Sequence, residues 1–145
     1  MSETALTPSE EKTKDKCYKG YMYILKNLAF SSNVFSIDDG IVVYFMDKST
    51  DPMDIINKMT NYYSTPTEVI YISEKTCDIV RVDHVLFKVL QPYQLEQDGY
   101  YYKCSKKKLI DTIKLAVTEM NKHHVSIGCN CIDNTVEPNY KKDTV

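Results

Sequence analysis

The sequence predicts an α+β fold: a small, mainly antiparallel β-sheet of three or four strands flanked by three helices. Short segments rich in aromatic and β-branched residues are typical of strands, and between them apolar residues recur every three to four positions, as on the buried face of a helix. The length of 145 residues fits one domain, because a folded chain of this size buries roughly two-thirds of the surface that its unfolded form exposes. The elements are expected in the order strand, strand, helix, strand, helix, strand, helix.

The first two strands are predicted from the alternation of their side chains. In Lys19–Lys26, Tyr21 and Tyr23 fall on one face and the intervening apolar residues fall on the other, so both faces are expected to be partly covered. The turn residues 38–40, Asp-Asp-Gly, precede a second strand at Ile41–Met46. The second strand is therefore expected to pair antiparallel to the first.

The first helix is predicted to begin at Asp51 and Pro52. An aspartate at the cap accepts hydrogen bonds from free backbone N–H groups, and proline fits the first helical position. The helix is expected to end before Pro66, because the residue before a proline is disfavoured in the helical conformation. The later elements are expected to be a strand at Glu68–Ser73, a helix at Cys77–Leu90, a strand at Gly99–Lys103 and a helix capped by Ser105.

The folded domain is expected to span residues 16–125. Residues 1–15 mix Ser, Thr, Glu and Lys with almost nothing to bury, which predicts a disordered N-terminal tail. Residues 126–145 show no periodicity, which predicts a loosely ordered C-terminal tail.

Composition indicates an intracellular protein, cytoplasmic or nuclear. Five cysteines form an odd count without regular spacing, which favours reduced thiols over a secreted disulfide framework. The longest apolar runs are far shorter than the roughly 20 residues that cross a bilayer, so no membrane partner is expected. The formal net charge of −2 argues against a protein whose main role is binding the phosphate backbone.

Four segments resemble the motifs of a known family. Gly20–Leu25 and Tyr44–Pro52 are tyrosine-bearing strand segments, the second leading into a helix, and Val82–Leu86 and Gly99–Cys104 follow them. In this order they resemble the motifs of GIY-YIG nuclease domains, in the branch seen in phages and large DNA viruses. The resemblance covers residues 19 to 115 and implies a GIY-YIG-like α+β domain.

The family's chemistry implies roles for particular positions, and several of these depart from the family pattern. The family uses two strand tyrosines near the scissile phosphate, an arginine on the first helix and a metal-binding glutamate on the next helix. Tyr23 and Tyr44 match the tyrosines, whereas Ile55 stands at the arginine position and Asp83 at the glutamate position. Asp47 replaces the glycine of the second motif. Because losing one preorganised electrostatic contact costs on the order of a hundredfold in rate, Tyr23, Tyr44 and Asp83 are expected to be vestigial catalytic residues.

The resemblance therefore implies a catalytically degenerate domain that acts as a binding module for a protein partner, or for host proteins if the chain is viral. No cofactor is expected, and Mg²⁺ would serve only a residual endonuclease activity. Two alternatives stay open. Tyr23 and Tyr44 are also explained as ordinary cross-strand aromatic neighbours, and the motif matches as accidents in an unrelated α+β interaction protein.

Weak nucleic-acid binding is the alternative function. Lysines beside tyrosines combine positive charge with rings on which bases stack, a contact that contributes roughly 1 to 3 kcal/mol per base. Lysines in the first turn of a helix are equally typical of a solvated face. The residues of this candidate surface are Lys48, Tyr101, Lys103, Lys106, Lys107 and Lys108.

The C-terminal region also holds residues that can bind zinc, namely His123, His124, Cys129 and Cys131. The Cys-x-Cys spacing is shorter than the usual gap of two to four residues, and the segment is expected to be loosely ordered. No metal site is therefore predicted, and the cysteines are expected to act as small buried hydrophobes.

Overall fold

The computed structural model describes residues 17–27, 43–63, 66–95 and 99–139. It confirms the predicted fold class, an α+β fold with a four-stranded antiparallel sheet and three α-helices. The predicted tail at 1–15, the turn at 38–40 and the last residues, 140–145, lie outside the described residues.

The sheet is formed by β1 (Tyr21–Lys26), β2 (Val43–Ser49), β3 (Glu68–Ile72) and β4 (Tyr101–Lys103), in the order β3-β1-β2-β4. The most buried strand, β1, lies in the interior of the sheet, paired antiparallel with β2 and β3. β4 extends the sheet from the free side of β2. The antiparallel pairing of the first two strands is thus as predicted.

The three helices are α3 (Pro52–Tyr62), α4 (Ile79–Val89) and α5 (Lys106–Ile127), and a short 3₁₀ helix, η1 (Gln91–Tyr93), follows α4. The predicted caps are present in two of them. Asp51 Oδ1 accepts a hydrogen bond from the Asp54 N–H at 3.3 Å, and Ser105 Oγ accepts one from the Lys108 N–H at 3.1 Å.

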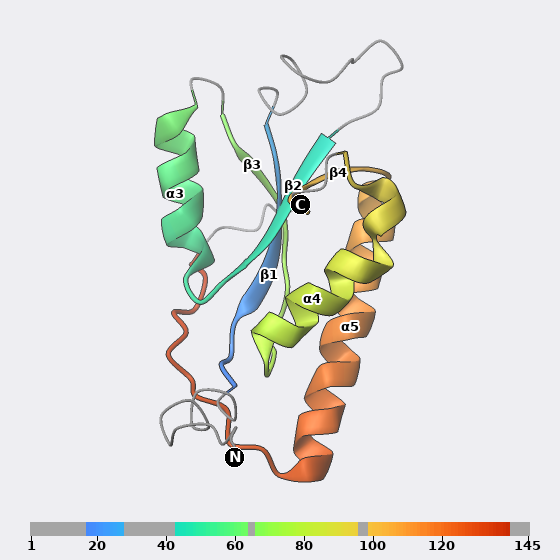
Figure 1. The fold of residues 1–145 in the computed structure, drawn as a ribbon. Coiled ribbons are helices and arrows are strands. Elements are labelled where there is room, and N and C mark those ends of the chain that lie inside the picture. Colours follow the sequence, from blue (N-terminus) through green and yellow to red (C-terminus); the bar gives the residue numbers. More distant parts are fainter. Residues whose placement is uncertain (1–16, 28–42, 64–65, 96–98, 140–145) are drawn as a thin grey trace, which may run out of the picture.

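The helices cover the two faces of the sheet unequally (Figure 1). Helix α3 packs on one face, with Ile56 buried against Tyr21, Tyr23 and Leu25. Helices α4 and α5 share the other face. Their buried stripes surround Met22, Ile24, Tyr44 and Met46 and consist of Ile79, Val82, Leu86, Leu109, Ile113 and Val117.

Residues 129–139, here termed the C-terminal strap, run from the end of α5 past the start of β1 towards the start of α3 (Figure 1). The Ile132 N–H donates to the Cys17 carbonyl at 2.9 Å, and the Val136 N–H donates to the Thr50 carbonyl at 2.8 Å. The sequence pattern predicted that the domain ends near residue 125. These hydrogen bonds instead join residues of the strap to the domain. No helix in the described part of the chain is both long and apolar enough to cross a membrane.

Candidate metal centre

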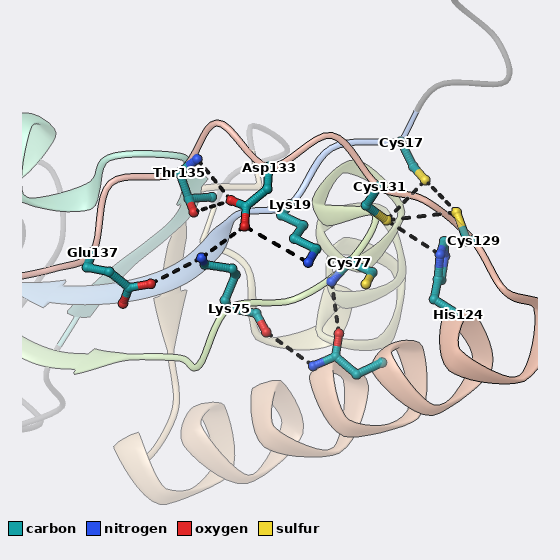
Figure 2. Close-up of polar contacts among 11 residues, drawn as sticks. Cys17, Lys19, Lys75, Cys77, His124, Cys129, Cys131, Asp133, Thr135 and Glu137 are labelled. Carbon is teal, nitrogen blue, oxygen red and sulfur yellow. Dashed lines mark hydrogen bonds and ion pairs between the residues drawn. The ribbon is translucent and has the colours of Figure 1, made fainter.

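Three thiols and one imidazole converge where the N-terminal segment, the end of α5 and the strap meet (Figure 2). The ligand atoms of Cys17, His124, Cys129 and Cys131 all lie within 4.8 Å of one another. The His124 side chain is buried, and the three cysteines are partly buried. Such a set is the Cys₃His donor set of structural zinc sites.

The distances between the ligand atoms are close to those expected for four ligands placed tetrahedrally around a zinc ion. Zinc–sulfur bonds of about 2.3 Å and zinc–nitrogen bonds of about 2.0 Å imply sulfurs about 3.8 Å apart and a sulfur–nitrogen separation of about 3.5 Å. Cys129 Sγ lies 3.9 Å from Cys131 Sγ, and Cys131 Sγ lies 3.6 Å from His124 Nδ1. Cys17 Sγ is nearer, at 3.1 Å from Cys129 Sγ and 3.2 Å from Cys131 Sγ. Of these four contacts, the two made by Cys17 would have to lengthen for an ion to bind.

The C-terminus of α5 brings Cys129 back towards His124. Gly128 adopts φ 65° and ψ 34°, the left-handed conformation that glycine reaches without steric cost. The Gly128 N–H donates to the Val125 carbonyl at 3.2 Å, and the Cys129 N–H donates to the His124 carbonyl at 3.1 Å. The turn that ends the helix thus reverses the chain beside the imidazole.

A short parallel pairing places Cys131 beside Cys17. Tyr18 and Ile132 form a parallel bridge, with the Ile132 N–H on the Cys17 carbonyl and the Lys19 N–H on the Ile132 carbonyl, both at 2.9 Å. Cys17 and Cys131 each precede a residue of this bridge, so the backbone pairing brings their side chains together. The two thiols are separated by 114 positions in the sequence.

Asp78 supports the imidazole from its other side. It stands at the N-cap of α4 in the left-handed region, with φ 50° and ψ 59°, and its side chain makes no capping hydrogen bond. Its Oδ2 lies 3.7 Å from His124 Nε2 and 3.5 Å from Arg81 Nε. His124 therefore presents Nδ1 to the thiols and Nε2 to a carboxylate, the orientation in which protein carboxylates support a metal-bound histidine.

The thiols differ in their tendency to ionise. Burial raises the pKa of Cys131, but hydrogen bonds from Cys17, Cys77, the Asp78 backbone N–H and Cys129 outweigh it and lower the pKa overall. Burial raises the pKa of Cys17, and its hydrogen bonds to the neighbouring thiols act in the same direction. Cys131 is accordingly the position at which these groups stabilise negative charge, as a metal-binding thiolate requires.

A fifth donor and a network of charges border the cluster (Figure 2). Burial raises the pKa of Cys77 to about 11, and a hydrogen bond to Cys131 makes a smaller contribution in the same direction. Lys75 Nζ binds two carboxylates of the strap, Asp133 at 3.2 Å and Glu137 at 3.1 Å. Hydrogen bonds from the Thr135 hydroxyl and then from Lys75 lower the pKa of Asp133 to about 2. These contacts hold the strap beside the thiols.

The expectation that Tyr23 and Tyr44 face a common site is wrong. Tyr23 belongs to the core under α3, and Tyr44 belongs to the core under α4 and α5, on the opposite face of the sheet. Tyr23 pairs with Asp47 across the antiparallel ladder, and side chains alternate between faces along β2, which turns Tyr44 away. The aromatic residue of β2 on the face of Tyr23 is Phe45, whose ring centroid is 6.1 Å from that of Tyr23.

At the other positions implied by the resemblance, the side chains pack in the core or form an ion pair. Ile55 packs against the core under α3, and Asp83 Oδ2 lies 3.1 Å from Lys48 Nζ. The first-motif glycine has a packing reason, since a Cβ at Gly20 would lie 2.9 Å from Cγ1 of Ile79. The described residues thus do not assemble the constellation that the family's chemistry requires.

Five of the six predicted nucleic-acid residues lie in β4 and the first turn of α5, and the sixth, Lys48, lies near the end of β2. Lys103 pairs with Val43 in the sheet, five residues along β2 from Lys48, which corresponds to about 16 Å. Lys107 Nζ lies 2.6 Å from Asp111 Oδ2, and Lys108 Nζ lies over the Tyr93 ring, 5.6 Å from its centroid. Lys106 is exposed in the first turn of α5, and Tyr101 is a partly buried residue of β4. The sheet register thus separates Lys48 from Lys103, and Lys48 and Lys107 are each paired with a carboxylate.

Comparisons with models of protein families, with curated proteins and with solved structures find no match for this chain. Fold and cluster together define an α+β domain with a candidate Cys₃His centre. Three of its four residues, His124, Cys129 and Cys131, were candidates in the sequence, but the Cys-x-Cys spacing and the expected loose order of the segment led to the prediction of no metal site, which differs from the arrangement seen here. The Gly-Cys-x-Cys motif shortly after His124 could have indicated the site from local sequence. Cys17 lies 112 positions from Cys129, and the sequence around it does not indicate a ligand.

Proposed function

We propose that this protein is a non-catalytic, structural zinc-binding module. In this proposal one Zn²⁺ is held by Cys17, His124, Cys129 and Cys131 and clamps the N-terminal segment and the strap to α5. The observation that carries the proposal is the convergence of all four ligand atoms within 4.8 Å, from three separate segments of the chain.

The chemistry of the donors favours zinc. Thiolate and imidazole ligands suit zinc, whereas magnesium and calcium require oxygen ligands. A two-iron cluster distributes its ligands over two metal atoms, whereas these four atoms are close enough to contact one ion. Four protein ligands leave no open coordination position, which favours a structural over a catalytic role.

The non-catalytic part of the proposal is supported by the family positions. Tyr23 is only 1% exposed, and Tyr44 lies on the opposite face of the sheet. Ile55 is apolar, and Lys48 is paired with Asp83. The remaining role is binding, with a protein as the proposed partner because the net charge is −2 and two of the candidate lysines, Lys48 and Lys107, are paired with acids.

Metal content tests the zinc proposal. Purified protein should contain close to one zinc per chain, and Cys131→Ser should lose most of it and weaken zinc binding in competition with a chromophoric chelator. Cys104→Ser is the matched control, because Cys104 is also partly buried but belongs to the core beside α4 and α5 rather than to the cluster. Wild-type protein that neither carries nor takes up zinc would overturn the proposal.

A cleavage assay tests the non-catalytic proposal. Purified protein with Mg²⁺ or Mn²⁺ should leave single-stranded and double-stranded DNA and RNA intact. Cleavage that disappears in Tyr23→Phe would contradict the proposal, because it would require Tyr23 to act on substrate from within the core.

A further inference from the structure

Cys17 and Cys131 have the arrangement of a disulfide pair as well as that of two zinc ligands. Their sulfurs are 3.2 Å apart, and each residue directly precedes one partner of the Tyr18–Ile132 bridge. Paired strands lie about 4.7–4.9 Å apart, which is inside the range of Cα separations, about 4.4–6.8 Å, that disulfides span. A bond between these sulfurs therefore requires a closing of the side chains and no movement of the paired backbone.

The backbone distinguishes this pair from the other close contact of Cys17. Cys129 Sγ is equally near, at 3.1 Å, but Cys129 follows the left-handed Gly128 and its N–H is bound to the His124 carbonyl. The position of Cys129 is thus set by the end of α5. The position of Cys131 is set by the same pairing that positions Cys17.

We propose that Cys17 and Cys131 form a reversible disulfide whose formation by a hydroperoxide and whose reduction by a thiol alternate with zinc binding. The alternation rests on the proposed zinc site, whereas the disulfide itself rests only on the geometry of the two cysteines. Zinc then closes the clamp under reducing conditions, and the disulfide closes it between the same two segments under oxidising conditions.

The chemistry uses one hydroperoxide per disulfide. The Cys131 thiolate attacks a peroxide oxygen, the O–O bond breaks, and Cys131 sulfenic acid and hydroxide form. Cys17 then attacks the Cys131 sulfur and gives its thiol proton to the departing hydroxide, which forms the S–S bond and water. The two sulfurs together lose two electrons, and the two peroxide oxygens gain them. Zinc loses two of its four ligands and dissociates.

The experiment treats full-length protein, both zinc-loaded and metal-free, with hydrogen peroxide and maps disulfides by mass spectrometry of unreduced digests. No lysine or arginine separates Cys129 from Cys131, so trypsin leaves both in one peptide, and Cys129→Ser and Cys131→Ser are needed to assign the bond. Cys77→Ser tests the neighbouring thiol as the partner, and Cys104→Ser is the control outside the cluster.

In metal-free protein, wild type, Cys129→Ser and Cys77→Ser should all link Cys17 to the peptide that contains residue 131, and Cys131→Ser should not. Saturating zinc should slow formation of the bond at least tenfold, and each disulfide formed should release one zinc. Dithiothreitol should restore zinc binding.

A bond that persists in Cys131→Ser, or one that joins Cys77 instead, would overturn the proposed disulfide. Zinc-binding protein that forms no bond would overturn the disulfide and leave the zinc site standing. A Cys17–Cys131 bond in protein that does not bind zinc would overturn the proposed function and the alternation, and leave the disulfide standing.

Discussion

His124 lies between a thiol and a carboxylate, with Nδ1 3.6 Å from Cys131 Sγ and Nε2 3.7 Å from Asp78 Oδ2. A histidine that binds a metal through one nitrogen commonly gives the other to a carboxylate, which fixes the ring and increases its basicity. Asp78 does this from a left-handed backbone conformation that aspartate and asparagine tolerate better than most residues. The conformation of α4 at its first turn is thereby connected to the candidate metal centre.

Asp78→Asn should weaken zinc binding about 10- to 100-fold, because losing a partner behind a metal ligand typically has this effect. Asparagine keeps the size and the left-handed conformation of residue 78, so the change isolates the carboxylate charge. A competition titration with a chromophoric chelator measures the dissociation constant. Asp83→Asn removes a carboxylate of the same helix that is paired with Lys48, and its zinc affinity should stay within about threefold of wild type. Equal affinities of wild type and Asp78→Asn would contradict this role.

At the scale of elements, the end of α5 is the feature on which the geometry of the cluster depends. The helix is stopped by a glycine with positive φ, and the next residues return beside the last turn. A Cβ at Gly128 would meet no atom within 4 Å. A substitution there therefore acts through backbone conformation and not through a clash.

Gly128→Ala should destabilise the protein by about 1 kcal/mol, because alanine pays the left-handed conformational cost that glycine avoids. Zinc affinity should fall with it, since Cys129 and Cys131 follow directly. Chemical denaturation measures the stability change, and the chelator competition measures the affinity. Gly128→Asn should lose less, since asparagine enters the left-handed region more readily than alanine. The reverse order of the two variants would contradict the explanation.

At the scale of the whole molecule, the candidate centre connects segments that secondary structure leaves separate. Cys17 precedes β1, His124 lies in the last turn of α5, and the strap continues to Val136, whose N–H is bound to the Thr50 carbonyl before α3. A ligand that binds only the folded chain stabilises it in proportion to the logarithm of its concentration over the dissociation constant. Zinc bound at this point is therefore expected to stabilise the whole fold.

Free zinc at about a thousandfold above its dissociation constant stabilises the folded chain by about 4 kcal/mol. Removing zinc with a strong chelator should therefore lower the melting temperature by roughly 10 °C. Differential scanning calorimetry at neutral pH under reducing conditions measures the shift. Cys104→Ser should show the same shift as wild type, and Cys131→Ser should show little. An unchanged wild-type melting temperature would contradict a structural role for the metal.

Alkaline stability depends in part on Tyr23 and Tyr44, two of the buried tyrosines of the sheet. Burial raises the pKa of Tyr23 and of Tyr44, so the fold favours their neutral forms. Tyrosines in the unfolded chain ionise near pH 10. This contribution to stability is therefore complete below about pH 10 and is lost as pH rises above it. Tyrosinate absorbance of the buried rings should increase together with the loss of circular dichroism. The midpoint of that transition should move to higher pH in Tyr23→Phe, and an unmoved midpoint would contradict the prediction.

Local physical chemistry in the sequence was enough for the fold class, the order of the elements and two of the helix caps. Asp51 with Pro52, Ser105 and the alternation in β1 act over a few residues, so they can be recognised without tertiary information. The face on which Tyr44 lies could not be recognised in this way, because side chains alternate in a strand and a motif aligned one residue away selects the opposite face. Phe45, and not Tyr44, lies on the face of Tyr23.

By itself, the sequence determined that this chain forms a mainly antiparallel sheet of three or four strands flanked by three helices, since periodicity, caps and turn residues act between near neighbours. Only the tertiary structure decided that Cys17 meets Cys129 and Cys131 across more than a hundred positions, beside a histidine oriented by Asp78. The physical reason is that the cluster depends on the left-handed turn at Gly128 and on a parallel bridge between Tyr18 and Ile132, which lie at opposite ends of the chain. The spacing of these residues along the sequence does not predict that they come together in the fold.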